Sequence, residues 1–293
     1  MRYLLIYNPV SGRENSRTTK LGNILMKLGK NGNELMVYQT QGKGDARRYL
    51  SLVREQYDMV IACGGDGTLH DVLNGVFQNH LCLPIGYIPL GSTNDFASGM
   101  GIHFRNAVEL ILRDCRKRVD VGRFNGEYFS YVAAFGTITS VSYSTPQNIK
   151  NSFGYMAYII EGIKQITQMR SYRVRFQINQ QEEEDDILIG IISNSLSVAG
   201  VKSKKMNPSL DDGMMEYLFI KKPNHIIDLQ TVVALLLQEK YDEKYMYYGK
   251  TSALSLHFEE EVEWTLDGEF GGQWEEVEIE TCPKKLEIAA GVE

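Results

Sequence analysis

Apolar and polar residues follow two different patterns along the chain, and the first pattern fills its opening part. Four short apolar runs suited to buried strands lie at residues 3–7, 35–38, 58–63 and 85–89. Between them, apolar residues recur at i, i+3, i+4 and i+7, the spacing of one helix face, in the segments 21–28, 46–53 and 69–76. This alternation predicts a parallel sheet with helices on both faces, a three-layer α/β domain.

A loop rich in small and polar residues follows each predicted strand. These loops are Asn8 to Gly12, Thr40 to Gly44, Gly64 to Thr68 and Gly91 to Asp95. The strands of a parallel sheet end at the same edge, where such sheets bind their ligands. We therefore expect the four loops to converge on one site.

The second pattern begins near Asp120, where the helical spacing weakens. Strand-like segments follow at residues 128–134, 172–178, 187–193 and 215–220, which predicts an antiparallel, β-rich domain. The chain has 293 residues, enough for two domains. We place them at residues 1–119 and 120–293, with a last strand at about 284–293 that can return to the first domain.

Composition and charge narrow the function classes. The net charge of −6 argues against a general nucleic-acid binder, and no segment has the length and hydropathy of a signal peptide or a membrane span. The four cysteines have the spacing of neither a zinc site nor a disulfide framework, so we expect a protein of the reducing cytoplasm. Lys202, Lys204 and Lys205 follow the apolar Val198 to Val201 and could contact the inner face of a membrane, although a solvated loop fits as well.

The segment Gly64 to Thr68 has the chemistry of a phosphate site. Gly64 and Gly65 lack side chains, so backbone N–H groups can approach an oxyanion closely at the start of a helix. Asp66 would repel phosphate unless a cation lies between them, which points to a magnesium–nucleotide complex. Asp66 and Thr68 could also simply cap the following helix.

The loop matches neither GxxxxGK[ST] nor GxGxxG. Gly64-Gly65-Asp66-Gly67-Thr68 instead resembles the nucleotide loop of the diacylglycerol kinase-like lipid kinases, which include sphingosine and ceramide kinases. Asn8 to Gly12, Thr40 and Gly91 to Ala97 resemble further nucleotide segments of that family, in the same order. The resemblance implies ATP and Mg²⁺ as cofactors. The nucleotide-site residues that it implies are Asn8, Pro9, Val10, Ser11, Gly12, Thr40, Gly64, Gly65, Asp66, Gly67, Thr68, Leu69, His70, Gly91, Thr93, Asn94 and Asp95.

The resemblance continues into the second half, beginning at Val119 to Gly122, and implies a C-terminal β-sandwich domain with the acceptor held between the domains. Asn207 to Gly213 resembles a structural magnesium site, with Ser209, Asp212 and the Met214 carbonyl as implied ligands. Leu266-Asp267-Gly268-Glu269 resembles a segment whose glutamate is taken as the general base, which makes Glu269 the expected catalytic residue beside Asp66. On pattern alone, Asp-Gly reads as a hairpin turn.

Some positions depart from the family pattern. His70 and Asp71 replace the usual Asn-Glu, and Asp45 stands where many members have histidine. These changes leave the phosphate loop intact, and Asp71 keeps the carboxylate at its position.

The resulting hypothesis is an ATP-dependent kinase that phosphorylates a lipid hydroxyl, most simply that of diacylglycerol, at a membrane surface. Two alternatives remain: an NAD kinase-like enzyme, whose first domain also carries GGDGT, and a nucleotide- or lipid-binding regulator without catalysis. Apolar residues between Phe153 and Ile166 could line an acceptor pocket or form core. The sequence leaves open which lipid is the acceptor and whether the chain acts as a homodimer.

Overall fold

The computed structural model describes residues 1–11, 17–54, 56–136, 170–194, 209–238 and 240–291. The chain divides into two compact units, Met1–Val119 together with Lys284–Glu293, and Asp120–Pro283. Gly12, the apolar segment 153–166 and the lysines at 202–205 lie outside the described residues. In the described part of the chain, no helix combines the length and hydropathy that a bilayer-spanning segment needs.

The first unit is built on a parallel sheet. Its strands follow the order β2 (Glu34–Gln39), β1 (Arg2–Tyr7), β3 (Met59–Gly64), β4 (Ile85–Pro89) and the end of β13 (Glu269–Ala289). Each neighbouring pair runs parallel, and every residue of β3 and β4 is buried. The apolar runs form strands because both faces of a parallel sheet are covered.

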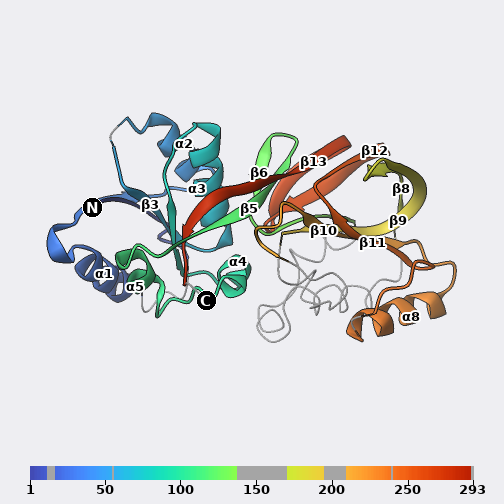
Figure 1. Ribbon diagram of the computed structural model, residues 1–293, viewed down its shortest axis with the longest axis horizontal. Coiled ribbons are helices and arrows are strands. Elements are labelled where there is room, and N and C mark those ends of the chain that lie inside the picture. Colours follow the sequence, from blue (N-terminus) through green and yellow to red (C-terminus); the bar gives the residue numbers. More distant parts are fainter. Residues whose placement is uncertain (12–16, 55, 137–169, 195–208, 239, 292–293) are drawn as a thin grey trace. The chain divides into compact units, whose positions relative to one another are not determined.

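Helices cover both faces of this sheet, which confirms the predicted α/β class (Figure 1). The helices are α1 (Arg17–Leu28), the 3-10 turn η2 (Lys30–Gly32), α2 (Asp45–Leu52), α3 (Asp66–Gln78), α4 (Asp95–Gly99) and α5 (Ala107–Leu112). Helices α2 and α3 pack together, and α1 packs with α5. A Cβ on Gly75 would lie 2.6 Å from Leu50 Cδ1, so this glycine allows α2 and α3 to approach.

One local prediction in this unit is wrong. Residues Gly64 to Thr68 do not form a loop, because β3 ends at Gly64 and α3 begins at Asp66. Only Gly65 connects the two, and it is the N-cap residue of α3. Asp66 and Thr68 therefore belong to the first helical turn, and neither is the cap.

The second unit is dominated by antiparallel strands. They are β5 (Arg116–Phe124, which begins in the first unit), β6 (Glu127–Phe129), β7 (Val132–Gly136), β8 (Tyr172–Ile178), β9 (Gln181–Ser193), β10 (Met215–Lys221), β11 (Met246–Thr251), β12 (Ala253–Leu266) and most of β13. The long strands β9 and β12 each pair with β7 at one end and with β8 at the other. The strands thereby enclose a core, as in a sandwich.

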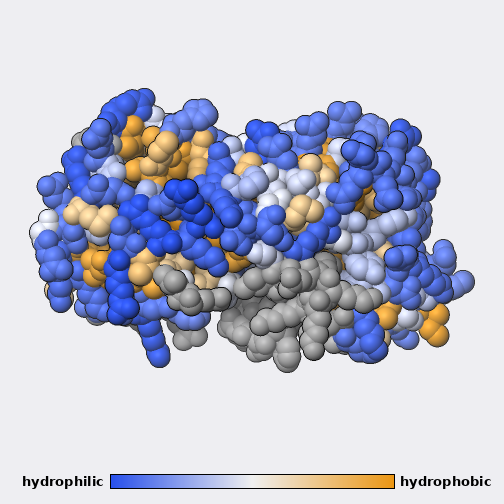
Figure 2. All heavy atoms as spheres, viewed as in Figure 1, coloured by the Kyte–Doolittle hydropathy of each residue, from blue (hydrophilic) through white to orange (hydrophobic). Residues whose placement is uncertain are grey.

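Two apolar clusters hold this unit together. One is rich in aromatic side chains and includes Phe135, Phe258 and Trp264, whose rings contact one another. The other lies under helix α8 (Ile226–Leu237), where Val232 and Leu236 pack against strand residues. Hydrophilic side chains dominate the face shown in Figure 2, with small hydrophobic areas between them.

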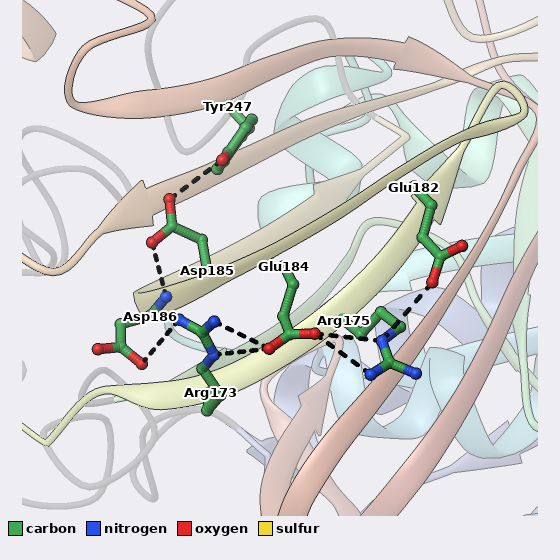
Figure 3. A network of polar contacts seen from close by, with 7 residues as sticks. All are labelled: Arg173, Arg175, Glu182, Glu184, Asp185, Asp186 and Tyr247. Carbon is green, nitrogen blue, oxygen red and sulfur yellow. Dashed lines mark hydrogen bonds and ion pairs between the residues drawn. The ribbon is translucent and has the colours of Figure 1, made fainter.

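Strand β9 is longer than predicted, because its polar first half also pairs with β8. Arg173 and Arg175 of β8 both contact Glu184 of β9, with N–O distances of 2.8 and 3.3 Å (Figure 3). Tyr247 of β11 donates to Asp185 at 3.0 Å. Opposite charges across paired strands stabilise the pairing, and they explain why residues 181–186 form a strand without apolar alternation.

Candidate functional site

Backbone hydrogen bonds join the strand ends of the first unit. The Asn8 N–H donates to the Cys63 carbonyl at 3.0 Å, and the Leu90 N–H donates to the Gly64 carbonyl at 2.7 Å. The segments that follow β1, β3 and β4 are thus tied to one another at the carboxyl edge of the sheet. The Thr40 N–H likewise donates to the Tyr7 carbonyl at 2.9 Å, so all four predicted segments are brought together in this way.

Two glycines allow the segments after β3 and β4 to touch. A Cβ on Gly91 would lie 2.7 Å from Gly65 Cα and 2.8 Å from Asn94 Oδ1, distances that the present backbone does not permit. Asn94 is left-handed, with φ of 50°, and its side chain accepts from the Gly91 N–H at 3.0 Å and donates to the Gly91 carbonyl at 2.8 Å. The asparagine therefore fixes the turn that brings Gly91 onto Gly65.

Asp66 lies at the centre of these segments, half-buried in the first turn of α3. Its carboxylate accepts from the Thr93 hydroxyl at 3.3 Å, the Asp95 N–H at 3.2 Å and the Tyr87 hydroxyl at 3.4 Å. The first N–H groups of a helix have no intrahelical acceptor and carry partial positive charge. The site thus combines a carboxylate with the helix N-terminus that an anion prefers.

The donor set suits nucleotide-bound magnesium better than a cage made by protein alone. In the described ranges, no group of three or more His, Cys, Asp or Glu side chains is arranged to hold a metal ion. Mg²⁺ in nucleotide sites takes one or two carboxylates and completes its shell with phosphates and water. Asp66 and the neighbouring Asp95 can supply that number.

Asn8 links the first segment to helix α3. Its side-chain nitrogen lies 3.1 Å from the Thr68 hydroxyl, and its side-chain oxygen accepts from the Val10 N–H at 3.0 Å. A Cβ on Gly64 would come within 2.2 Å of Thr68 Oγ1, so glycine is required beside this contact. Pro9 and Ser11 complete the described part of the turn, and the Ser11 N–H donates to the Asn8 carbonyl at 3.3 Å.

Asp45 closes the turn that follows β2. Its carboxylate accepts from the Gln41 N–H at 2.8 Å, the Tyr38 hydroxyl at 3.0 Å and Arg48 at 2.6 Å. The hydrogen bond from Gln41 is the main cause that lowers the pKa of this carboxyl group, and Arg48 adds to the effect. The aspartate that departs from the family pattern is therefore a structural group that shapes the turn after Thr40.

Asp71 anchors the same turn from helix α3, because its carboxylate accepts from the Gly44 N–H at 2.7 Å. Two predicted nucleotide residues on α3 lie in the interior. Leu69 has no exposed surface and His70 has only 4%, so their side chains pack inside the unit. The His70 carbonyl accepts from the Asn74 side chain at 3.0 Å.

In the second unit, Glu269 begins β13 directly after a two-residue turn. Asp267 and Gly268 form that turn with φ of 52° and 82°, the signs of a type I′ hairpin. Asp267 and Gly268 therefore form a hairpin turn, and Glu269 directly after it is half-buried. Glu269 is positioned by the pairing of β12 with β13.

Asp267 holds the turn, a role that no pattern in the sequence predicts. Its Oδ2 atom accepts from the Ser130 N–H at 2.9 Å and the Ser130 hydroxyl at 3.2 Å, while its Oδ1 accepts from the N–H groups of Tyr131 and Val132 at 2.8 and 3.1 Å. These bonds interrupt the strand predicted at residues 128–134. The structure has two strands there, β6 and β7, because Ser130 and Tyr131 direct their N–H groups to a carboxylate.

The implied magnesium ligands Ser209, Asp212 and Met214 lie in one turn. The Ser209 hydroxyl donates to Asp211 at 2.8 Å, and Asp212 accepts from the Met214 N–H at 3.1 Å and from Lys250 Nζ at 2.6 Å. Hydroxyl, carboxylate and carbonyl oxygens are the ligands that Mg²⁺ prefers. The chemistry fits a magnesium ion, with the Lys250 ammonium as a competing cation on the same carboxylate.

Asp120 supports this turn from β5. The Asp120 side chain is fully buried and accepts from the Gly213 N–H at 2.6 Å, and its own N–H donates to the Leu210 carbonyl at 2.7 Å. Sequence reasoning placed Asp120 only at the start of the second domain. The signal available in the sequence was an aspartate between two strand-forming residues, Val119 and Val121.

Known proteins resemble this chain over most of its length. The family model of the diacylglycerol kinase catalytic domain matches residues 2–124. A diacylglycerol kinase of Staphylococcus saprophyticus is 33% identical over 278 residues, covering 93% of this chain and 90% of the relative. A diacylglycerol kinase of Bacillus subtilis is 30% identical over 275 residues, covering 92% and 90%. A crystal structure of a diacylglycerol kinase from Bacillus anthracis superimposes with a TM-score of 0.79 at 25% identity, covering 99% of this chain and 97% of that one.

Proposed function

The chain belongs to the diacylglycerol kinase family of lipid kinases, and from this we propose that it transfers the γ-phosphate of Mg²⁺-bound ATP to the hydroxyl of diacylglycerol. The observation that carries the proposal is Asp66, held in the first turn of α3 where the segments after β3 and β4 meet. The relatives named above support diacylglycerol as the acceptor. Acting on such a lipid would bring the enzyme to a membrane surface.

The first unit would bind the nucleotide phosphates. The backbone N–H groups at the start of α3 would face the phosphate oxygens, and the contact between Gly65 and Gly91 would hold the segments after β3 and β4 together beside them. Asp66, with Asp95 beside it, would hold the magnesium ion, which neutralises phosphate charge when bound. Phosphoryl transfer depends mainly on such positioning and charge neutralisation.

Glu269 would act as the general base. The lipid hydroxyl oxygen forms a bond to the γ-phosphorus, the bond from that phosphorus to the β,γ-bridging oxygen breaks, and ADP leaves with the electron pair. The hydroxyl proton passes to the Glu269 carboxylate. General bases contribute roughly 10²–10⁴-fold to such reactions.

A structural magnesium ion at Ser209, Asp212 and the Met214 carbonyl is a separate part of the proposal. Binding there would stabilise the second unit, because a cation that binds only the folded state raises its stability. Magnesium should raise the thermal unfolding midpoint of the wild type but not that of Asp212→Asn. An equal rise in both proteins would exclude this site.

Transfer of labelled γ-phosphate from ATP to a lipid panel tests the activity. The panel contains diacylglycerol, monoacylglycerol, sphingosine and undecaprenol in detergent micelles, with NAD as a soluble acceptor. We expect label in phosphatidic acid. Label in NADP would favour the NAD kinase-like alternative, and tight ATP binding without transfer to any acceptor would favour a regulator.

A further inference from the structure

The first unit has a cleft that none of the predicted nucleotide residues lines. It lies between the start of β5, the last part of β13 and the connection from α3 to β4, with a volume of about 560 Å³. Four cationic side chains line it: Arg116, Arg118, Lys284 and Lys285. Pockets of about 300–1,000 Å³ are typical of small-molecule sites.

Cations outnumber carboxylates among the described residues that line this cleft. Glu287 lies between the two arginines, with Arg116 Nη1 at 2.9 Å and Arg118 Nε at 3.1 Å from its oxygens. Arg116 also contacts Asp114 at 2.6 Å. Among the described residues that line the cleft, four are cations and one, Glu287, is a carboxylate, although the chain as a whole carries a net charge of −6. A local concentration of positive charge on an acidic protein attracts anions.

The Glu287 carboxylate in the cleft remains ionised and is bound by both arginines. Arg116 is the main cause that lowers the pKa of Glu287, and Arg118 lowers it further. The Glu287 contacts fix the two arginine side chains in place, since a charge-assisted pair restricts both partners. The guanidinium groups are thus oriented in advance, each with N–H donors beyond those that Glu287 accepts.

The α3–β4 connection adds an apolar wall. Phe77 at the end of α3 and Leu81 and Leu83 in the connection are half-buried and line the cleft. The Lys285 ammonium lies 5.0 Å from the centre of the Phe77 ring, a cation–π distance. An apolar wall beside fixed cations can also contact the organic part of a phosphate-bearing anion.

The cleft lies at the edge of the sheet away from the nucleotide segments. Its wall ends at Pro84, directly before β4, whereas the Gly91 segment follows the other end of that strand. A five-residue strand spans about 16 Å at 3.3 Å per residue. One triphosphate cannot occupy both places, so the two sites are distinct.

We propose that this cleft binds a phosphate-bearing anion, either a soluble phosphate compound or the headgroup of an anionic lipid. Arg116, Arg118, Lys284 and Lys285 would contact the phosphate oxygens. The proposal is independent of the lipid acceptor and of the kinase reaction.

Cys82 provides a local reporter, because its exposed thiol lines the cleft while Cys63 is buried. An anion bound there would cover the thiol and so slow its alkylation. The experiment measures Cys82 alkylation by N-ethylmaleimide in the full chain, with peptide mass spectrometry to resolve the sites. The probes are inorganic pyrophosphate, phosphatidylglycerol vesicles and phosphatidylcholine vesicles, at an ionic strength matched with NaCl.

The variant Lys284→Gln/Lys285→Gln removes two cations from the cleft, and Lys27→Gln/Lys30→Gln removes two exposed lysines elsewhere in the same unit. A probe at ten times its Kd leaves about one-eleventh of the sites open, so labelling should slow about tenfold. We expect this protection in the wild type and in the Lys27/Lys30 variant, and its loss in the Lys284/Lys285 variant. Circular dichroism checks that each variant is folded.

The probes then separate the two sources of phosphate. Protection by pyrophosphate supports a soluble ligand, and protection by phosphatidylglycerol but not phosphatidylcholine vesicles supports a lipid headgroup. Unchanged Cys82 labelling with every probe overturns the proposal. Equal protection of the wild type and the Lys284/Lys285 variant overturns it too.

Discussion

Replacing Asp267 with asparagine should weaken the second unit by about 3 kcal/mol. The carboxylate accepts four hydrogen bonds, two on each oxygen, from Ser130, Tyr131 and Val132. An asparagine keeps one oxygen, so whichever way it turns, its NH₂ group meets a buried N–H donor. A hydrogen bond to a charged group contributes about 1.5–3 kcal/mol, and an unpaired buried donor costs about 1–3 kcal/mol. Asp267→Ala would lose all four bonds and could fail to fold, so Asp267→Asn is the variant whose stability can be measured.

Tryptophan fluorescence reports this effect selectively. The chain has two tryptophans, Trp264 in β12 and Trp274 in β13, and both belong to the second unit. With a urea dependence of about 2–3 kcal/mol per molar, a loss of 3 kcal/mol lowers the midpoint of this transition by about 1–1.5 M. The control is Glu261→Gln, which removes a carboxylate from an exposed side chain of the same hairpin.

The control should stay within about 0.5 kcal/mol of the wild type, as surface substitutions usually do. If Asp267→Asn unfolds at the same urea concentration as Glu261→Gln, the carboxylate does not hold the turn that precedes Glu269. The account of the strand break between β6 and β7 would then be wrong as well.

Two further changes test other parts of the structure. Gly91→Ala should weaken ATP binding at least tenfold, measured by calorimetry, because its Cβ would lie 2.7 Å from Gly65 Cα. The control variant Gly99→Ala meets nothing within 4 Å and should bind ATP normally. Equal ATP affinities of the two variants would show that the close approach of Gly91 to Gly65 is not needed. Burial raises the pKa of Glu216 from 4.5 to about 7, so the folded state holds a proton that the unfolded state releases, and stability falls as pH rises from about 4.5 to 7. Glu216→Gln should remove this dependence and be more stable than the wild type at pH 8.5 by up to about 3 kcal/mol, measured by urea unfolding in EDTA. A wild type whose stability is flat across that range would contradict the assignment.

The strands of the first unit could be predicted because apolar runs and helical spacing are local signals. The run at residues 85–89 is β4, and the run at 3–7 is β1 but for one residue. The start of α3 was misplaced because glycine and aspartate favour loops as well as helix N-termini. Gly65, the one residue between β3 and α3, packs against Gly91, a contact that the local pattern around Gly65 does not contain.

Side chains that act over long sequence separations were not predictable. Asp267 bonds to backbone groups more than 130 residues away, so no window of sequence contains both partners. The partners of Asp45, Gln41 and Arg48, are close to it in sequence. Its role was still not predictable, because an aspartate that begins a helix and one that anchors a turn have the same sequence pattern. The first half of β9 was missed since its stability comes from charges on β8 and not from apolar alternation.

The most direct test of the central claim compares the wild type with Glu269→Gln in phosphate transfer to dioleoylglycerol. Phosphorus NMR follows the ATP γ-resonance and the phosphomonoester of the lipid product, while calorimetry measures ATP affinity in parallel. The account predicts one phosphatidate formed per ATP consumed by the wild type, and a rate lower by roughly 10²–10⁴-fold in Glu269→Gln with ATP affinity unchanged. Full transfer by Glu269→Gln, or ATP consumption by the wild type without lipid phosphate, would contradict it.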